Sequence, residues 1–108
     1  MKNQLIIDPR KLSEDLRIRL ADELNDEHNL NLLSQDASML VRLHVVWNPA
    51  TPVKCLNDLA QDSEIGVRHA ISNNSRTPSQ SLKRLLQDSS RLVSSSAKST
   101  LRKLGVKV

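Results

Sequence analysis

Residues 48–78 read NPATPVKCLNDLAQDSEIGVRHAISNNSRTP, and this stretch decides the fold. The pattern at its start returns 26 residues later, so that Asn48, Thr51 and Pro52 correspond to Asn74, Thr77 and Pro78. The same interval relates apolar and acidic positions along the chain: Leu30, Leu56 and Leu82; Leu33, Leu59 and Leu85; Asp36, Asp62 and Asp88; Val41, Val67 and Val93. An ordered series of matches without gaps predicts an internal repeat of three units, at about residues 22–47, 48–73 and 74–99.

Each unit is predicted to form two short helices. Thr51-Pro52 marks the start of the first helix, because a threonine hydroxyl can cap a free backbone N–H and proline suits the first helical position. Leu56 and Leu59 fall on one stripe of this helix, and Val67 opens the buried stripe of the second. Helices of about ten residues or fewer are unstable alone, so each unit must pack against its neighbours, as units of a solenoid do.

The whole chain, residues 1–108, is predicted to be one all-α domain, a short α-solenoid of about three 26-residue helix-pair repeats. Residues 8–27 are expected to form an N-terminal capping helix, with Asp8 as its N-cap. Residues 28–104 supply the repeats and a C-terminal helix, which Gly105 ends. No strands are expected.

Composition excludes several classes of protein. The single cysteine, Cys55, rules out an internal disulfide and an all-cysteine metal site. The longest apolar run, residues 39–47, is interrupted by Arg42 and His44, so no membrane-spanning segment and no membrane partner are expected. These observations favour a cytoplasmic domain.

The repeat resembles the leucine-rich repeat variant (LRV) family and, more distantly, HEAT repeats. The resemblance is carried by the Asn-Pro-x-Thr-Pro start at residues 48–52, the Leu-Ala-x-Asp end of the first helix at residues 59–62, and Val-Arg-x-Ala at residues 67–70. It covers about residues 28–100 and weakens where Ser75 replaces the second proline and Ser94 replaces the arginine. It implies stacked helix pairs in a right-handed superhelix that serves as an interaction surface, and it implies no activity.

An arginine follows the repeated aspartate by six residues in two units. These residues form a candidate structural ladder: Asp36, Arg42, Asp62, Arg68 and Asp88. The arginines pair with aspartates, within a unit or between neighbours, or they form a row that binds phosphate. The resemblance to HEAT repeats favours the structural role, and Arg68 is then expected to be substantially buried.

Basic residues gather in the last third of the chain. The net charge is +4, and residues 76–108 hold eight lysines and arginines against one acidic residue, Asp88. A basic end can bind nucleic acid, or it can be a solvated surface. The candidate partner-binding residues here are Lys83, Arg84, Arg91, Arg102 and Lys103.

Trp47 is the only aromatic residue and ends the second helix of the first unit. If exposed it is the best single anchor for a protein partner, because tryptophan is enriched at binding hot spots. The alternative is that it packs against the capping helix.

No residue pattern indicates catalysis or a cofactor. His28, His44, His69 and Cys55 lack the spacing of metal ligands, and no base is predicted beside Cys55. We therefore expect a small non-enzymatic repeat module, with no cofactor and no metal, that mediates protein–protein interaction. The alternative is a nucleic-acid-binding adaptor that uses the basic C-terminal end. An acidic N-terminal end and a basic C-terminal end also permit head-to-tail self-association.

Overall fold

The computed structural model describes residues 8–108, so residues 1–7 of the expected domain lie outside the described part of the chain. Over residues 8–108 every regular element is a helix and there is no strand, which confirms the all-α class. The elements are the 3₁₀ helix η1 (Pro9–Lys11) and the α-helices α1 (Glu14–Glu23), α2 (Glu27–Leu33), α3 (Met39–Trp47), α4 (Val53–Leu59), α5 (Ile65–Ser72), α6 (Ser79–Leu85) and α7 (Arg91–Lys103).

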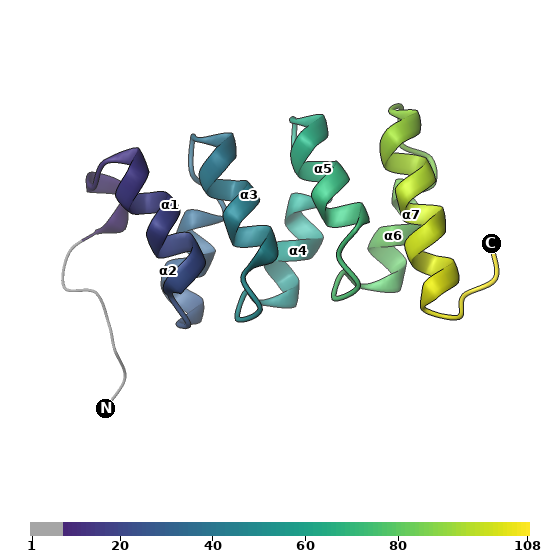
Figure 1. Cartoon of the computed structure of the whole chain (residues 1–108), viewed down its shortest axis with the longest axis horizontal. Helices are drawn as coiled ribbons and strands as arrows, with labels where there is room; N and C mark the ends of the chain where they lie inside the picture. The colour runs from purple at the N-terminus through teal and green to yellow at the C-terminus, as the bar shows by residue number, and fades with distance from the viewer. Residues whose placement is uncertain (1–7) are drawn as a thin grey trace.

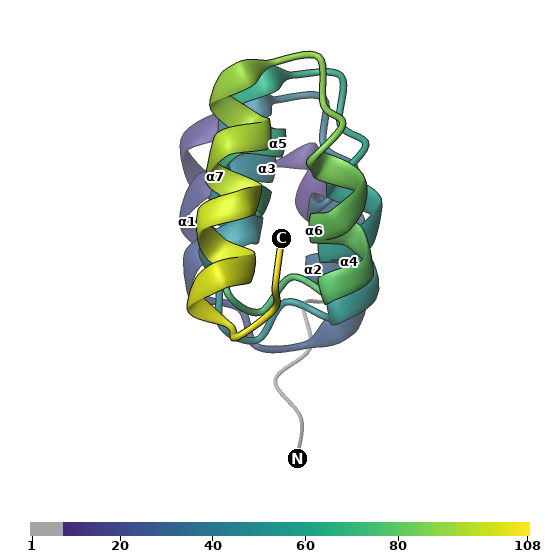
Figure 2. The same ribbon diagram turned by 90° about the vertical axis from the view of Figure 1, so that its right-hand side faces the viewer.

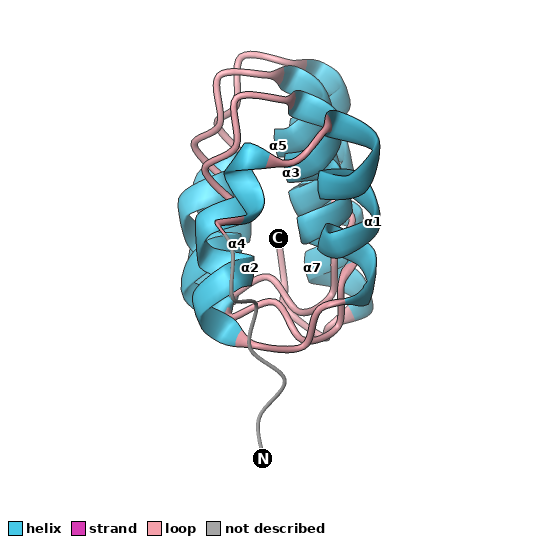
Figure 3. Cartoon of the chain, turned by 90° about the vertical axis from the view of Figure 1, so that its left-hand side faces the viewer, coloured by secondary structure: helices cyan, strands magenta, loops and turns pink. Residues whose placement is uncertain are grey.

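The helices form two layers (Figure 1). Helices α1, α3, α5 and α7 lie side by side in one layer, and each contacts the next. Helices α2, α4 and α6 form the second layer, and each packs against the helix that follows it in the chain. Figure 2 shows the two layers from the C-terminal end and Figure 3 from the N-terminal end. The molecule is elongated along the stacking direction, with extents of 45, 28 and 16 Å.

The core runs between the layers and is built from the repeated apolar positions. All nine repeated leucines and valines are buried: Leu30, Leu33, Val41, Leu56, Leu59, Val67, Leu82, Leu85 and Val93. Aliphatic side chains alone fill this space, since the one aromatic residue of the chain, Trp47, is exposed.

The N-terminal segment differs from the expected capping helix. Residues 8–27 do not form one helix: η1 ends at Lys11, the chain is extended at Leu12 and Ser13, and α1 begins at Glu14. Asp8 caps η1 and Ser13 caps α1 through its hydroxyl, so a second cap interrupts the predicted helix. The segment thus repeats the helix-pair arrangement, with η1 in place of the first helix.

The Thr-Pro motif also acts differently from the prediction. Pro52 and Pro78 have extended backbones and precede the helices as N-caps rather than occupying the first helical position. The hydroxyl of Thr51 does not cap the following helix. It donates to the carbonyl of Val45 at 2.6 Å, and therefore ties the turn to the helix before it. The sequence alone could not predict this bond, because a threonine hydroxyl can hydrogen-bond to the backbone of the preceding helix or to that of the following helix.

We predict that Leu59→Ala lowers the free energy of unfolding by about 2–5 kcal/mol, the usual cost of truncating a buried leucine. Leu59 is 4% exposed and belongs to the core between the layers. Urea unfolding followed by far-UV circular dichroism measures the change. The matched control is Val53→Ala in the same helix, which is 49% exposed and should stay within about 0.5 kcal/mol of wild type. Equal stability of the two variants would contradict the placement of Leu59.

Candidate functional site

The repeated arginines and aspartates pair between consecutive helix pairs. Arg42 donates from Nε to Asp62 Oδ2 at 2.8 Å and from Nη2 to Asp62 Oδ1 at 3.1 Å. Arg68 makes the same two-pronged contact with Asp88, at 2.8 and 3.3 Å. Each pair therefore joins a helix of one unit to the turn of the next, which decides between pairing within a unit and pairing across units.

Each aspartate of this arginine–aspartate ladder has a second role in its own turn. Oδ1 of Asp62 accepts the backbone N–H of Glu64 at 2.9 Å, immediately before α5. Asp36 and Asp88 accept from the N–H groups of Ser38 and Ser90 at the same distance. The carboxylate thus stabilises the turn that precedes a helix. The same carboxylate also accepts hydrogen bonds from the arginine of the preceding unit.

The third nitrogen of each guanidinium is also engaged. Nη1 of Arg42 donates to the Asp36 carbonyl at 2.7 Å, and Nη1 of Arg68 donates to the Asp62 carbonyl at 2.8 Å. The Arg68 and Asp88 side chains are 14% and 9% exposed. Because all three nitrogen atoms contact protein, this row of arginines is built into the fold and does not offer free groups to a phosphate.

Arg17 is a third ladder arginine that sequence analysis missed. It donates from Nε to Asp36 Oδ2 at 2.9 Å and from Nη1 to the Leu12 carbonyl at 2.7 Å. It precedes Arg42 by 25 residues rather than 26, so it falls out of the repeat register. The repeat register alone gives no signal for it; Arg17 can be inferred only once the structure shows that Arg42 pairs with the next unit, which leaves Asp36 in need of an arginine from the preceding unit.

A second column of hydrogen bonds runs along the opposite ends of the helices. The Asn48 side chain donates to the carbonyls of Ala21 and Leu24 at 2.8 and 2.7 Å. Asn74 donates to Val46 at 2.8 Å, and Thr100 takes the same place, donating to Ser72 at 2.6 Å. The asparagine of the Asn-x-x-Thr motif therefore joins consecutive units, as the ladder does.

Two of the three histidines have structural partners, and the cysteine is buried. Nδ1 of His44 lies 2.7 Å from Asp22 Oδ1, and Nε2 of His69 lies 3.0 Å from Ser96 Oγ. Burial raises the pKa of the Cys55 thiol, which keeps it protonated at neutral pH. Residues 8–108 contain no group of three His, Cys, Asp or Glu side chains placed to hold a metal ion. His28 is exposed.

Trp47 is the last residue of α3 and is 55% exposed. Leu40, seven residues earlier on the same helix face, is 46% exposed, and Leu43 between them is half-buried. Trp47 is therefore not buried against the N-terminal segment. The three residues form the apolar α3 face.

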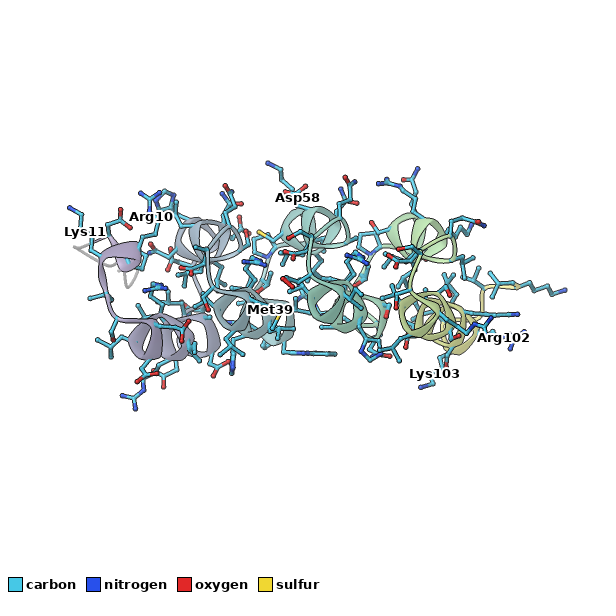
Figure 4. All side chains as sticks on the ribbon, turned by 90° about the horizontal axis from the view of Figure 1, so that it is seen from above. Arg10, Lys11, Met39, Asp58, Arg102 and Lys103 are labelled. Atoms are coloured by element: carbon cyan, nitrogen blue, oxygen red, sulfur yellow. The ribbon has the colours of Figure 1, made fainter. Side chains whose placement is uncertain are left out.

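The five candidate basic residues do not form one surface. Lys83 and Arg84 lie on α6 in the second layer, whereas Arg91 and Arg102 lie on α7. All five are exposed. Viewed from above in Figure 4, Arg102 projects at the C-terminal end, and its neighbour Lys103 projects at the side formed by the α1/α3/α5/α7 layer.

Comparisons of the chain with family models, with curated proteins and with solved structures gave no match. Among the helices formed by residues 8–108, none is long and apolar enough to cross a membrane.

We predict that Arg68→Ala lowers the free energy of unfolding by about 1–3 kcal/mol, because it leaves the largely buried Asp88 carboxylate and the Asp62 carbonyl without their donor. An exposed ion pair contributes only about 0–1 kcal/mol. The matched control is Arg84→Ala, which removes an exposed arginine that forms no ion pair in the described structure. Urea unfolding should separate the two variants, and equal midpoints would show that the ladder adds little to stability.

The contribution of this pair should disappear in acid. Hydrogen bonding to Arg68 lowers the pKa of Asp88 in the folded state, below the value of about 3.9 for an unfolded chain. A lowered folded pKa adds stability above the unfolded pKa, and that stability is lost as the pH falls through the folded pKa. The difference in unfolding free energy between wild type and Arg68→Ala should stay constant from about pH 7 to 5 and shrink below about pH 4. A difference that did not change with pH would assign the whole effect to the carbonyl contacts.

Proposed function

We propose that this chain is a short α-solenoid of the LRV and HEAT-like type, without enzymatic activity, and that it binds a partner protein through the apolar α3 face. The two-layer stack and the bonds between consecutive units support the solenoid interpretation. A right-handed superhelix and a cytoplasmic location stay predictions from the sequence.

The observation that carries the proposal is the exposure of Trp47 beside Leu40 and Leu43. A tryptophan costs little conformational entropy to fix and covers a large area, and it is the side chain most enriched at binding hot spots. The aliphatic side chains at the repeated core positions are all buried, so the core is complete without the Trp47 ring. The exposed Trp47 ring is therefore available to bind in a pocket of a partner protein.

The apolar surface extends beyond α3 toward the next helix. Met39 lies beside the start of α5 in Figure 4, and its sulfur is 3.8 Å from the position that a Cβ of Gly66 would occupy. Ile65, which precedes this glycine, is 50% exposed. A partner segment lying across α3 and the start of α5 would therefore cover apolar side chains from two consecutive units.

The alternative, a nucleic-acid-binding adaptor, has less support. The five candidate basic residues do not all face one way, since Arg102 projects at the C-terminal end and Lys103 at the side of the α1/α3/α5/α7 layer. Residues 48–108 contain no aromatic side chain on which a base could stack. Charge remains its only basis, and the experiment below includes nucleic acid among its outcomes.

We predict that a photo-crosslinking amino acid in place of His44, one turn from Trp47, forms an adduct with a protein in cells that express the chain. Trp47→Ala should weaken binding of that protein by about 30-fold, the effect of a hot-spot residue worth about 2 kcal/mol. The readouts are mass spectrometry of the adduct and calorimetry with the purified partner.

The control places the crosslinker at Val53, which is 49% exposed on α4 in the other layer. An adduct at position 44 and not at position 53 supports the proposal. Equal adducts at both positions, no adduct at position 44, or an adduct with nucleic acid would each overturn it.

A further inference from the structure

The C-terminal end of the stack differs from the surfaces between units in the charge it carries. Within the stack, α7 covers the face of α5 that contains Arg68, His69 and Ser72. Arg68 bonds to Asp88 in the turn before α7, His69 contacts Ser96, and the carbonyl of the fully buried Ser72 accepts from Thr100. This contact shows how the next helix pair sits on a unit.

Among the helices formed by residues 8–108, none covers the equivalent face of α7. The repeat places Ser94, Ser95 and Lys98 where α5 has Arg68, His69 and Ser72. Arg91 lies two turns before Lys98 and Arg102 one turn after it, so the three basic residues share one stripe of α7. On α6, Lys83 occupies the position of Asn57, whose side chain bonds to Ser81 of the following unit. Lys83 therefore faces the same end.

These charges are not neutralised within the described structure. The one acidic side chain from residue 76 onward, Asp88, is held by Arg68. No ion pair in residues 8–108 involves any of the four basic residues that we call the basic end: Lys83, Arg91, Lys98 and Arg102. The carboxylate of the last residue, Val108, lies near them but forms no ion pair with any of the four. Four exposed cations that form no ion pair favour an anionic partner.

The shape of this end suits a protein segment. A shallow hollow of about 480 Å³ is lined by Leu86, Arg91, Ser94, Ser95, Lys98 and Val108, which combine cations and hydroxyls with aliphatic groups. A second hollow of about 350 Å³ is lined by Arg102 and residues 105–108, and it adjoins the first because Val108 lines both. Leu86 occupies the position of Ala60, which is 7% exposed inside the stack, so an occupant would cover an apolar group there as well.

We propose that the basic end binds an acidic helix of a partner protein, which packs on α6 and α7 as a further unit would and places carboxylates against Arg91, Lys98 and Arg102. This surface is separate from the apolar α3 face, so either proposal can fail without the other. The proposal commits to a partner protein rather than to a second copy of this chain: at the N-terminal end, where Figure 4 places Arg10 and Lys11, Asp8 is already paired with Arg10, and head-to-tail self-association is one of the outcomes that would overturn the proposal.

The test uses a fluorescein-labelled, alanine-based helical peptide of about 18 residues with glutamates spaced to share one face, together with its all-glutamine counterpart. Anisotropy at about 25 mM salt should show the glutamate peptide binding at least about tenfold more tightly than the glutamine peptide, with the difference falling at about 150 mM salt. The combined variant Arg91→Glu, Lys98→Glu, Arg102→Glu should weaken that binding at least about tenfold.

The matched control variant, Lys11→Glu, Lys54→Glu, Lys103→Glu, changes the net charge equally but leaves the basic end intact. It should keep the affinity within about threefold. Both variants alter exposed residues, and equal melting temperatures verify that each is folded. Amide chemical shifts on adding the glutamate peptide to wild type should move around Ser94, Ser95 and Lys98 and not in α1.

Four outcomes overturn the proposal. They are equal losses in the two variants, chemical-shift changes spread over all basic residues, tighter binding of single-stranded or duplex DNA than of the glutamate peptide, and a wild-type self-association in sedimentation that the Arg91, Lys98 and Arg102 changes abolish. The third assigns the basic end to nucleic acid and the fourth to a second copy.

Discussion

The two-pronged contact between an arginine of one helix pair and an aspartate of the next is the interaction on which the stack depends. A guanidinium and a carboxylate that are largely removed from water are costly unless each is paired, and breaking such a pair strands a charge. Here the aspartate is held by a backbone N–H of its own turn, and the arginine by a carbonyl of the turn before its helix. Bonds within its own unit therefore orient each side chain, and the contact between the two side chains fixes the position of one unit relative to the next.

The ladder and the asparagine column act at opposite ends of the same helices. The ladder lies where α3, α5 and α7 begin, and the column lies where the chain turns back after α1, α3 and α5. A helix of seven to ten residues cannot hold its shape alone, and the leucine and valine core is not directional. Bonds at both ends supply the direction that apolar packing lacks, since sliding one unit along another would break both sets at once.

The sequence predicted the buried positions where the repeat is regular. It did not predict which partner a polar side chain contacts, because that depends on where the side chain points in the folded structure. The buried positions of Leu59 and Val67 follow from the period of 26, because equivalent residues of stacked units face the same core. Spacing could not say which carboxylate Arg42 reaches, because stacking brings Asp62 of the next unit to Arg42, whereas Asp36 of its own unit offers its backbone carbonyl. The same spacing rule hid Arg17, because one residue fewer separates it from its neighbour in the ladder. The five basic candidates appeared as one cluster because they are close in the chain, but neighbours on α7 point different ways: Arg102 projects at the C-terminal end and Lys103 at the side of the layer.

The ladder also explains why the surfaces that remain for partners are few. Arg17, Arg42 and Arg68 are all engaged inside the stack, so they cannot serve an outside ligand. Ser94 stands where the next arginine would be, and a further unit of the same kind would bring an aspartate to a site without its guanidinium. The positive charge of this end comes instead from Arg91, Lys98 and Arg102, which lie along one stripe of α7 rather than at the ladder position. A further unit of the same kind would therefore lack the ladder contact at this end, whereas the proposed partner, which presents several carboxylates along a helix, would use the stripe of basic residues instead.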